Sequence, residues 1–178
     1  SLDVKTERSV VTATTDLSVF TSNEIRALTN KQIAALTTTQ VAAIATDAMA
    51  GLAARQITAL GTRGTTALTT EQFHALSTTQ LAAFNKTQAA AFSSTQLNAL
   101  ASDQLAGLGA TQIGALSTAA VAGLDTSLLT HLSGTQVRAL TTVQVVALSS
   151  AQIAALGTDQ IASLKVSQVK AIETADIQ

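Results

Sequence analysis

The sequence predicts an all-α solenoid of about twenty very short capped helices built from an eight-residue repeat. The octad recurs without insertion or deletion from Phe20 to Ile172, and each of the twenty residues reached in steps of eight is Leu, Ile or Phe. Numbered from this apolar residue, position 5 is Gln in fourteen of the twenty octads. Positions 6 and 1 of successive units are both apolar at a helical spacing, which indicates helix rather than alternating strand.

One long helix cannot carry this pattern. Eight residues turn an α-helix by about 800°, so the apolar stripe would drift by roughly 80° in each octad. An octad is also not the heptad of a coiled coil. A series of short helices therefore remains the interpretation that fits the spacing.

Each octad carries its own signal for starting a helix. Thr37 and Gln40 fit a capping box, in which the hydroxyl accepts from the backbone of the third helical residue and the Gln side chain accepts in return. Leu36 and Val41 fit the accompanying hydrophobic staple. We expect helices of five to seven residues with corners at positions 2 and 3. Capping explains the Gln column locally, while a side-chain ladder or a polar face for lateral assembly remains an alternative.

Helices of this length are marginal in water, so they must stack on one another as solenoid repeats do. Position 8 is nearly always Ala or Gly, which allows close approach. Gly61, Gly109 and Gly157 occupy position 2 at intervals of six octads. Glycine tolerates left-handed corners, and this spacing favours a three-sided coil made of three octads. A helical hairpin made of two octads also divides the interval and stays open.

The chain divides into residues 1–19, an N-terminal cap or connecting segment, and residues 20–178, the octapeptide array. The region 44–67 departs most from the consensus, and we expect a frayed or missing helix there. Its glycines at 61 and 64 flank an arginine and could form an anion site, but a locally melted repeat is favoured. The segment 173–178 stops in mid-octad, as an excised piece or an end that meets another copy would.

Composition excludes several classes of function. The net charge is −1 with few charged residues and four Phe as the only aromatics, which argues against a nucleic-acid surface. No apolar run is long enough for a membrane span. The chain has no Cys, so disulfides and Cys-based metal sites are excluded. Abundant Thr without Cys fits an exported protein, although a cytosolic protein could look the same.

The sequence offers no catalytic, cofactor-binding or metal-binding residues that we would assign, and we expect no enzyme and no small-molecule substrate. His74 and His131 are far apart in the sequence, and we expect a solvated surface residue and a tolerated corner residue. Phe84 and Phe92 are expected to fill core volume beside Ala89 rather than to line a pocket. Acidic residues at position 4 suit the first helical turn; these are Asp47, Asp103 and Asp159.

Runs such as 36–43 (LTTTQVAA) and 148–155 (LSSAQIAA) resemble the Thr/Ala/Gln octapeptide arrays of large bacterial secreted surface proteins, both adhesin-like and haemolysin-type. The resemblance covers nearly the whole chain and implies export and an extracellular or cell-surface location. It brings no catalytic residues.

We therefore expect a structural segment: a rod, a spacer or a filament-forming subunit of an exported bacterial surface protein. Its partners would be copies of itself, assembled end to end or laterally. The alternative is an adhesive module whose outer face binds a protein, a glycan or ice. Position 7 should carry such a face, but its residues show no common chemistry; they include Arg26, Thr58, His74, Asn98, Thr130, Arg138 and Lys170.

Overall fold

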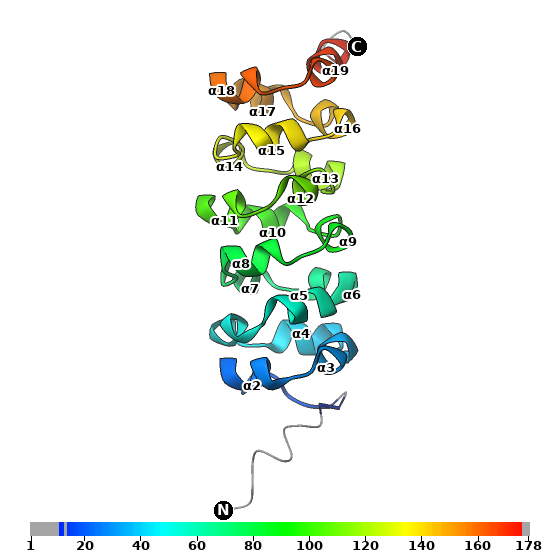
Figure 1. Cartoon of the computed structure of the whole chain (residues 1–178), viewed down its shortest axis with the longest axis vertical. Coiled ribbons are helices and arrows are strands. Elements are labelled where there is room, and N and C mark those ends of the chain that lie inside the picture. Colours follow the sequence, from blue (N-terminus) through cyan, green and yellow to red (C-terminus); the bar gives the residue numbers. More distant parts are fainter. Residues whose placement is uncertain (1–10, 13, 176–178) are drawn as a thin grey trace, which may run out of the picture.

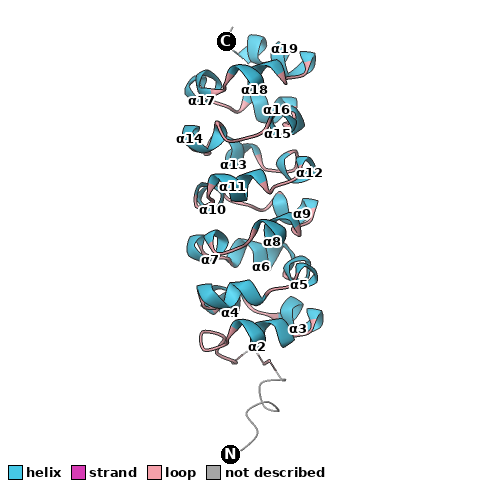
Figure 2. Cartoon of the chain, turned by 60° about the vertical axis from the view of Figure 1, so that its left-hand side comes forward, coloured by secondary structure: helices cyan, strands magenta, loops and turns pink. Residues whose placement is uncertain are grey.

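The helices form one unbranched column, which Figures 1 and 2 show from two directions. The computed structural model describes residues 11, 12 and 14–175, with side chains up to residue 172. In chain order the helices are α2 (Ser22–Ala27), α3 (Asn30–Ala35), α4 (Thr38–Ala43), the 3₁₀ helix η1 (Thr46–Gly51), α5 (Ala54–Ala59), α6 (Gly61–Ala67), α7 (Thr70–His74), α8 (Thr78–Ala82), α9 (Lys86–Ala89), α10 (Ser94–Asn98), α11 (Ser102–Ala106), α12 (Ala110–Ile113), α13 (Thr118–Ala122), α14 (Thr126–Leu129), α15 (Gly134–Ala139), α16 (Thr142–Val146), α17 (Ser150–Ala155), α18 (Thr158–Ala162) and α19 (Val166–Ala175). The described residues contain no strand. The prediction of a short-helix solenoid is confirmed.

The corners lie one position earlier than the sequence predicted. Most helices begin at position 3 and are preceded by two extended residues, as in Leu28 (φ −64°, ψ 138°) and Thr29 (φ −72°, ψ 156°). These two residues hold positions 1 and 2, so the chain turns there and not at positions 2 and 3. The apolar residue at position 1 therefore sits on the corner itself and can point inward between two helices.

Three octads make one coil. Most helices pack against the third helix after them, in a series that runs from α2 with η1 and α3 with α5 to α15 with α18 and α16 with α19. This relation settles the choice between a three-octad coil and a two-octad hairpin in favour of the coil. Figure 1 shows the consequence, because the chain climbs the column with the N-terminal helices at one end and α19 at the other.

The repeated glycines do not form the left-handed corners from which that coil was predicted, apart from Gly61. Gly61 alone among the described residues has a positive φ, at 61°. Gly109 and Gly157 have φ values of −71° and −72° and serve as ordinary extended N-caps. Their backbone is open to any residue, so the regular spacing of these glycines does not report left-handed corners.

The irregular region 44–67 keeps its helices, so the expectation of a frayed or missing one was wrong. η1 replaces an α-helix with a 3₁₀ helix that has no side-chain cap. Leu60 adopts helical angles (φ −55°, ψ −28°), and α6 follows α5 without the usual extended corner. The segment expected as a possible anion loop is the first turn of α6. Gly61 takes up the change of direction that an extended corner makes elsewhere.

A single hydrophobic core runs along the axis of the column. It is built mainly from positions 1 and 6, and Leu76, Leu100 and Leu140 are at most 4% exposed. Phe84 and Phe92 fill core volume beside the buried Ala89, as expected, and Phe73 joins them. The ring of Phe92 lies edge-on to both others, with centroid distances of 5.0 and 5.1 Å.

Small residues at position 8 do permit close approach between coils. A Cβ on Gly107 would lie 3.0 Å from the Cβ of Thr78, which holds position 3 three octads earlier. A Cβ on Gly51 would collide with the backbone of Ser22, again three octads earlier. We take the N-terminal end of the column as its bottom. Position 8 therefore lines the lower side of each coil, and its residues contact position 3 of the coil beneath.

The N-terminal boundary at residue 19 stays a prediction, because residues 1–10 and 13 lie outside the described part. Just before α2, Leu17 is fully buried, and it occupies position 6 of an incomplete octad. In the described residues, none of the helices has the length and apolarity needed to cross a bilayer.

Candidate functional site: a glutamine column between coils

The repeated Gln at position 5 first completes the helix cap of its own octad. In α15, the Ser133 hydroxyl accepts from the backbone N–H of Gln136 (3.3 Å), and Gln136 Oε1 accepts from the backbone N–H of Ser133 (2.8 Å). The same reciprocal box closes ten described helices. The pairs are Thr21 with Glu24, Thr29 with Gln32, Thr37 with Gln40, Thr69 with Gln72, Ser77 with Gln80, Asn85 with Gln88, Ser93 with Gln96, Ser133 with Gln136, Thr141 with Gln144, and Ser149 with Gln152. The predicted capping box is confirmed.

Where the N-cap residue is Ala or Gly, only half of the box remains. Gln104 Oε1 still accepts from the N–H of Ala101 at 2.8 Å, and Gln112 Oε1 does the same for Gly109 at 2.7 Å. No hydroxyl is present there to return the bond. The Gln half of the box is therefore the more constant one, which suggests that the side chain has a second task.

That second task is to bind the coil beneath. In ten octads of the described part, Nε2 donates to the carbonyl oxygens 31 and 28 residues earlier, at 2.6–3.2 Å. These glutamines are Gln56, Gln72, Gln80, Gln96, Gln112, Gln136, Gln144, Gln152, Gln160 and Gln168. The accepting residues stand at positions 6 and 1, at the C-terminal end of a helix four octads earlier. With three octads in a coil, this helix end lies below the corner that the Gln caps.

The arrangement satisfies groups that short helices leave without partners. A helix leaves its last four carbonyl groups without internal donors, and buried carbonyl groups need partners. An amide has one acceptor oxygen and two N–H donors, so one Gln can serve one N–H of its own corner and two carbonyls below. All thirteen position 5 glutamines between Gln40 and Gln168 are buried, with at most 8% of their surface exposed. Among the described residues, no buried side-chain nitrogen or oxygen lacks a hydrogen-bond partner.

This geometry explains the choice of amide over carboxylate. Glu can close a capping box, and Glu24 does so in the first octad. A carboxylate at an interior position would place its second oxygen against two carbonyl oxygens in a buried site, with no proton to donate. The capping role of the Gln was predicted from the sequence, but its contact between coils was not. The signal that could have revealed it is the preference for Gln over Glu, since capping alone accepts either.

Other side chains substitute where the Gln is missing. Position 5 of α6 is Gly64, and the neighbouring Arg63 donates from Nη2 to the carbonyl of Leu36 at 3.0 Å, the group that a Gln there would reach. Position 5 of α14 is Leu128. Asn98 from the coil beneath accepts from the backbone N–H of Asp125 at 3.0 Å and so replaces the missing Oε1.

Position 7 also links coils, although its residues share no chemical type. Thr58 Oγ1, His74 Nδ1 and Asn98 Nδ2 lie 3.1, 2.7 and 2.9 Å from carbonyl oxygens 25 residues later. Each acceptor stands at position 8 of the coil above. A carbonyl oxygen only accepts, so His74 must carry its proton on Nδ1. The outward exposure expected for His74 is observed, and a structural hydrogen bond accompanies it.

The remaining polar residues show local roles. His131 is exposed, and its Nδ1 lies 2.7 Å from the carbonyl oxygen of Ser127 in the preceding turn. Hydrogen bonds from its own backbone N–H and from two neighbouring hydroxyls lower the pKa of Glu71 in the first turn of α7. In the part of the chain that the structure describes, no three His, Asp or Glu side chains come together in a group that could hold a metal ion.

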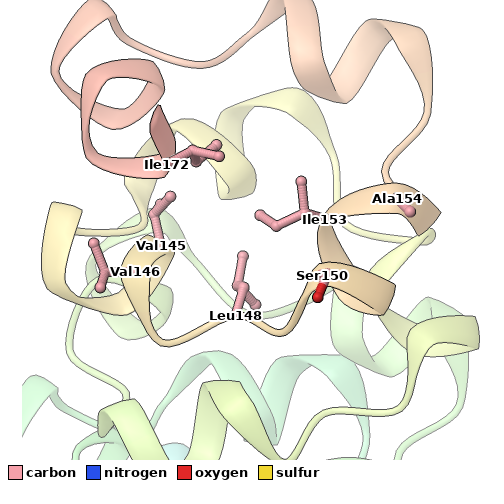
Figure 3. A pocket seen from close by; sticks show the side chains of 7 residues that line it. All are labelled: Val145, Val146, Leu148, Ser150, Ile153, Ala154 and Ile172. Carbon is pink, nitrogen blue, oxygen red and sulfur yellow. The ribbon is translucent and has the colours of Figure 1, made fainter. Parts of the chain in front are cut away.

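A cavity of about 200 Å³ lies near the C-terminal end of the column. Figure 3 shows its lining, in which Val145, Leu148, Ile153 and Ile172 converge from α16, α17, α19 and the corner between the first two. Val146, Ser150 and Ala154 complete it. Among the described residues that line it, Ser150 supplies one hydroxyl and the other side chains are apolar.

Comparison with known proteins supports a repeat region. The family model described as the ALTTAQ repeat matches the chain twice, over residues 13–46 and 132–166. Both matches cover octads with the hydroxyl, Gln and apolar residues described above. Neither the curated proteins nor the solved structures gave a match.

Proposed function

We propose that the chain is a structural segment, a rod or spacer whose length is set by the number of coils, in an exported bacterial surface protein. The observation that carries the proposal is the glutamine column, which joins consecutive coils from Gln40 to Gln168. Ten of its glutamines donate to carbonyl oxygens at the same two sequence separations, 31 and 28 residues. A coil can therefore be added without changing the kind of contact between coils. Such an array behaves as a chain of nearest-neighbour interfaces.

The adhesive alternative receives less support from the same geometry. A binding face needs polar groups that are free to meet a ligand. At position 7, Thr58, His74 and Asn98 instead use their side chains to join coils. The export and surface location rest on the resemblance to bacterial surface proteins, and the ALTTAQ matches agree with it as far as the repeat itself.

Small-angle X-ray scattering of length variants tests the rod. Duplication of residues 140–147 should lengthen the column by about a third of a coil, and their deletion should shorten it equally, because each change preserves the octad register. Deletion of 140–143 is the matched control. It removes the corner at Leu140 and Thr141 and should lower stability sharply. The proposal fails if the octad variants unfold as readily as the half-octad deletion, or if the maximum dimension does not follow the octad number.

Location needs a separate test. Antibodies raised against the purified segment should label intact cells of the organism that encodes it, without permeabilisation. Labelling that appears only after permeabilisation would contradict the surface location and leave the rod itself standing.

A further inference from the structure

One corner of the column carries a sequence pattern that the repeat does not require. Asn85, Lys86 and Thr87 form an Asn-X-Thr sequence, the acceptor pattern for N-linked sugars, in which X is any residue except Pro. The chain has four Asn, and three of them have no Ser or Thr two residues later. These three are Asn23, Asn30 and Asn98. The pattern therefore marks a single position.

Helix capping does not explain the choice of Asn at this corner. Asn85 is the only Asn at position 2 of the octads, where Thr and Ser are the most frequent residues. Its Oδ1 accepts from the backbone N–H of Gln88 at 3.0 Å, as the hydroxyls of Ser77 and Ser93 do for the Gln of their own octads at 3.2 and 3.1 Å. A hydroxyl thus caps the neighbouring helices equally well. The cap uses the oxygen of the Asn85 amide and has no use for its nitrogen.

That nitrogen is free and faces solvent. All three side chains of the Asn-X-Thr pattern are exposed, and Asn85 Nδ2 makes no hydrogen bond with any residue that the structure describes. Asn98 provides the contrast. Its Nδ2 donates to the carbonyl of Gly123 at 2.9 Å, and its Oδ1 accepts from the backbone N–H of Asp125 at 3.0 Å. Of these two amides, only Asn85 presents its nitrogen for reaction.

We propose that Asn85 is the acceptor of an N-linked sugar, transferred from a donor in which the sugar carries a diphosphate leaving group. Asn85 Nδ2 bonds to the anomeric carbon as the bond from that carbon to the diphosphate oxygen breaks. The diphosphate leaves with its carrier, and a basic group of the transferase takes one proton from the nitrogen. The product amide keeps its oxygen and one N–H, so the cap to Gln88 survives the modification.

The inference goes beyond the rod function and does not depend on it. A sugar at this exposed corner would extend into solvent and leave the glutamine contacts between coils intact, because Gln88 still reaches the carbonyl of Ile57 from its own side chain. Modified and unmodified columns should therefore have the same coil structure. The expected consequence is a hydrophilic group fixed at one height of the column.

Mass spectrometry of the chain isolated from the organism that encodes it tests the site. Cleavage after Glu71 and Asp103 releases peptide 72–103, which contains both Asn85 and Asn98. We expect this peptide to carry the added mass of a sugar, and fragmentation should place the sugar on Asn85. An unmodified peptide overturns the proposal, and so does a sugar on another residue of the peptide with Asn85 unmodified.

Variants made in the same organism separate the sequence pattern from the fold. Asn85→Ser keeps a capping oxygen but removes the acceptor, and Thr87→Ala keeps the acceptor but breaks the pattern. Both should lose the sugar completely while their circular dichroism spectra match the wild type. Thr87→Ser should retain it. Thr95→Ala is the matched control, since Thr95 holds the same position in the next octad of the same peptide, and it should also retain the sugar. A sugar that persists on Thr87→Ala would contradict the assignment.

The two possible diphosphate donors are distinguished by where the transfer occurs. Unmodified chain from cell-free translation is incubated with the soluble fraction or with the membrane fraction of the organism. Transfer by the soluble fraction identifies a nucleoside diphosphate sugar, and transfer confined to the membrane fraction identifies a lipid-linked diphosphate sugar. Transfer by neither fraction would overturn the assignment of a diphosphate donor. The rod is tested separately by the scattering of the length variants, so either proposal can fail without the other.

Discussion

Gln136 Nε2 donates to the carbonyl oxygen of Leu105 at 2.9 Å, which joins two residues that lie 31 positions apart in the chain and in different coils. The same nitrogen reaches Leu108 at 2.9 Å, while Oε1 accepts from Ser133 at 2.8 Å. One uncharged side chain thus fixes the start of its own helix and the end of a helix below. Local capping and long-range stacking depend on the same amide.

The replacement Gln136→Glu should separate these two roles. Glu can still close the capping box, but it cannot donate to Leu105 and Leu108 when ionised. We expect a loss of about 2–4 kcal/mol in the free energy of unfolding at pH 7, from unsatisfied carbonyls and a buried charge. Urea denaturation followed by circular dichroism measures it. Thr135→Glu, an exposed substitution in the same helical turn, is the control and should change the free energy of unfolding little.

The loss in free energy of unfolding caused by Gln136→Glu should become smaller as the pH falls. Burial against carbonyl oxygens raises the pKa of the new carboxyl group in the folded state, and the neutral acid can donate one hydrogen bond. The folded variant then binds more protons than the unfolded one, so its stability recovers as the pH falls through the raised pKa. A deficit independent of pH would show that the carboxylate leaves the site.

Completing a half-formed capping box should stabilise the protein. Ala101 precedes α11 with extended angles (φ −71°, ψ 160°), and its N–H already binds Gln104. Ala101→Ser adds the missing hydroxyl acceptor and should raise the free energy of unfolding by about 1 kcal/mol. The same change at Ala119, inside the first turn of α13, has no cap to complete and should give no gain. Equal effects of the two substitutions on the urea midpoint would contradict the capping geometry.

The glycines should differ sharply in their tolerance of Ala. Gly51→Ala should cost about 2 kcal/mol or more, because the new Cβ would meet the backbone of Ser22 in the coil beneath. Gly109→Ala should be neutral or stabilising by about 0.5 kcal/mol, since its φ is −71° and the nearest atom to a new Cβ is 3.6 Å away. Thermal melts of the two variants test the coil spacing directly. A stable Gly51→Ala protein would show that these coils lie further apart.

Glu71 gives a small stability dependence on pH. Its pKa is lowered from 4.5 by its own backbone N–H and by the hydroxyls of Thr69 and Thr70. A depressed folded pKa adds stability above the unfolded pKa, and this contribution disappears as the pH falls through the folded pKa. Glu71→Gln should therefore be slightly less stable than the wild type at pH 7 and indistinguishable from it near pH 2. A difference that persists in acid would not come from this charge.

The octad predicted the helices well, because a hydroxyl, a Gln and two apolar residues define a local motif within eight positions. Thr37 and Gln40 form the box that their spacing indicates. The contacts of Gln136 with Leu105 and Leu108 could not be found in the same way, since they depend on how many octads make a coil. That number is set by packing between helices and not by any single unit.

Irregular octads were harder for a related reason. Arg63 and Asn98 replace missing glutamines from neighbouring positions or neighbouring coils. Neither residue stands where the repeat places the Gln, so the substitution is visible only in three dimensions. The octad at Gly61 also departs from the consensus but still forms a helix, because the positive φ of Gly61 lets α6 start directly after α5.

Cysteine cross-linking tests the three-octad coil most directly, because the chain contains no Cys of its own. Thr79 and Asp103 are both exposed at position 4, on the packed helices α8 and α11. A bismaleimide that spans about 8–10 Å, the distance between packed helices, should link Thr79→Cys with Asp103→Cys. It should fail with Thr79→Cys and Thr95→Cys, which lie two octads apart instead of three. Efficient linking of the two-octad pair without the three-octad pair would contradict the coil and the glutamine column built on it.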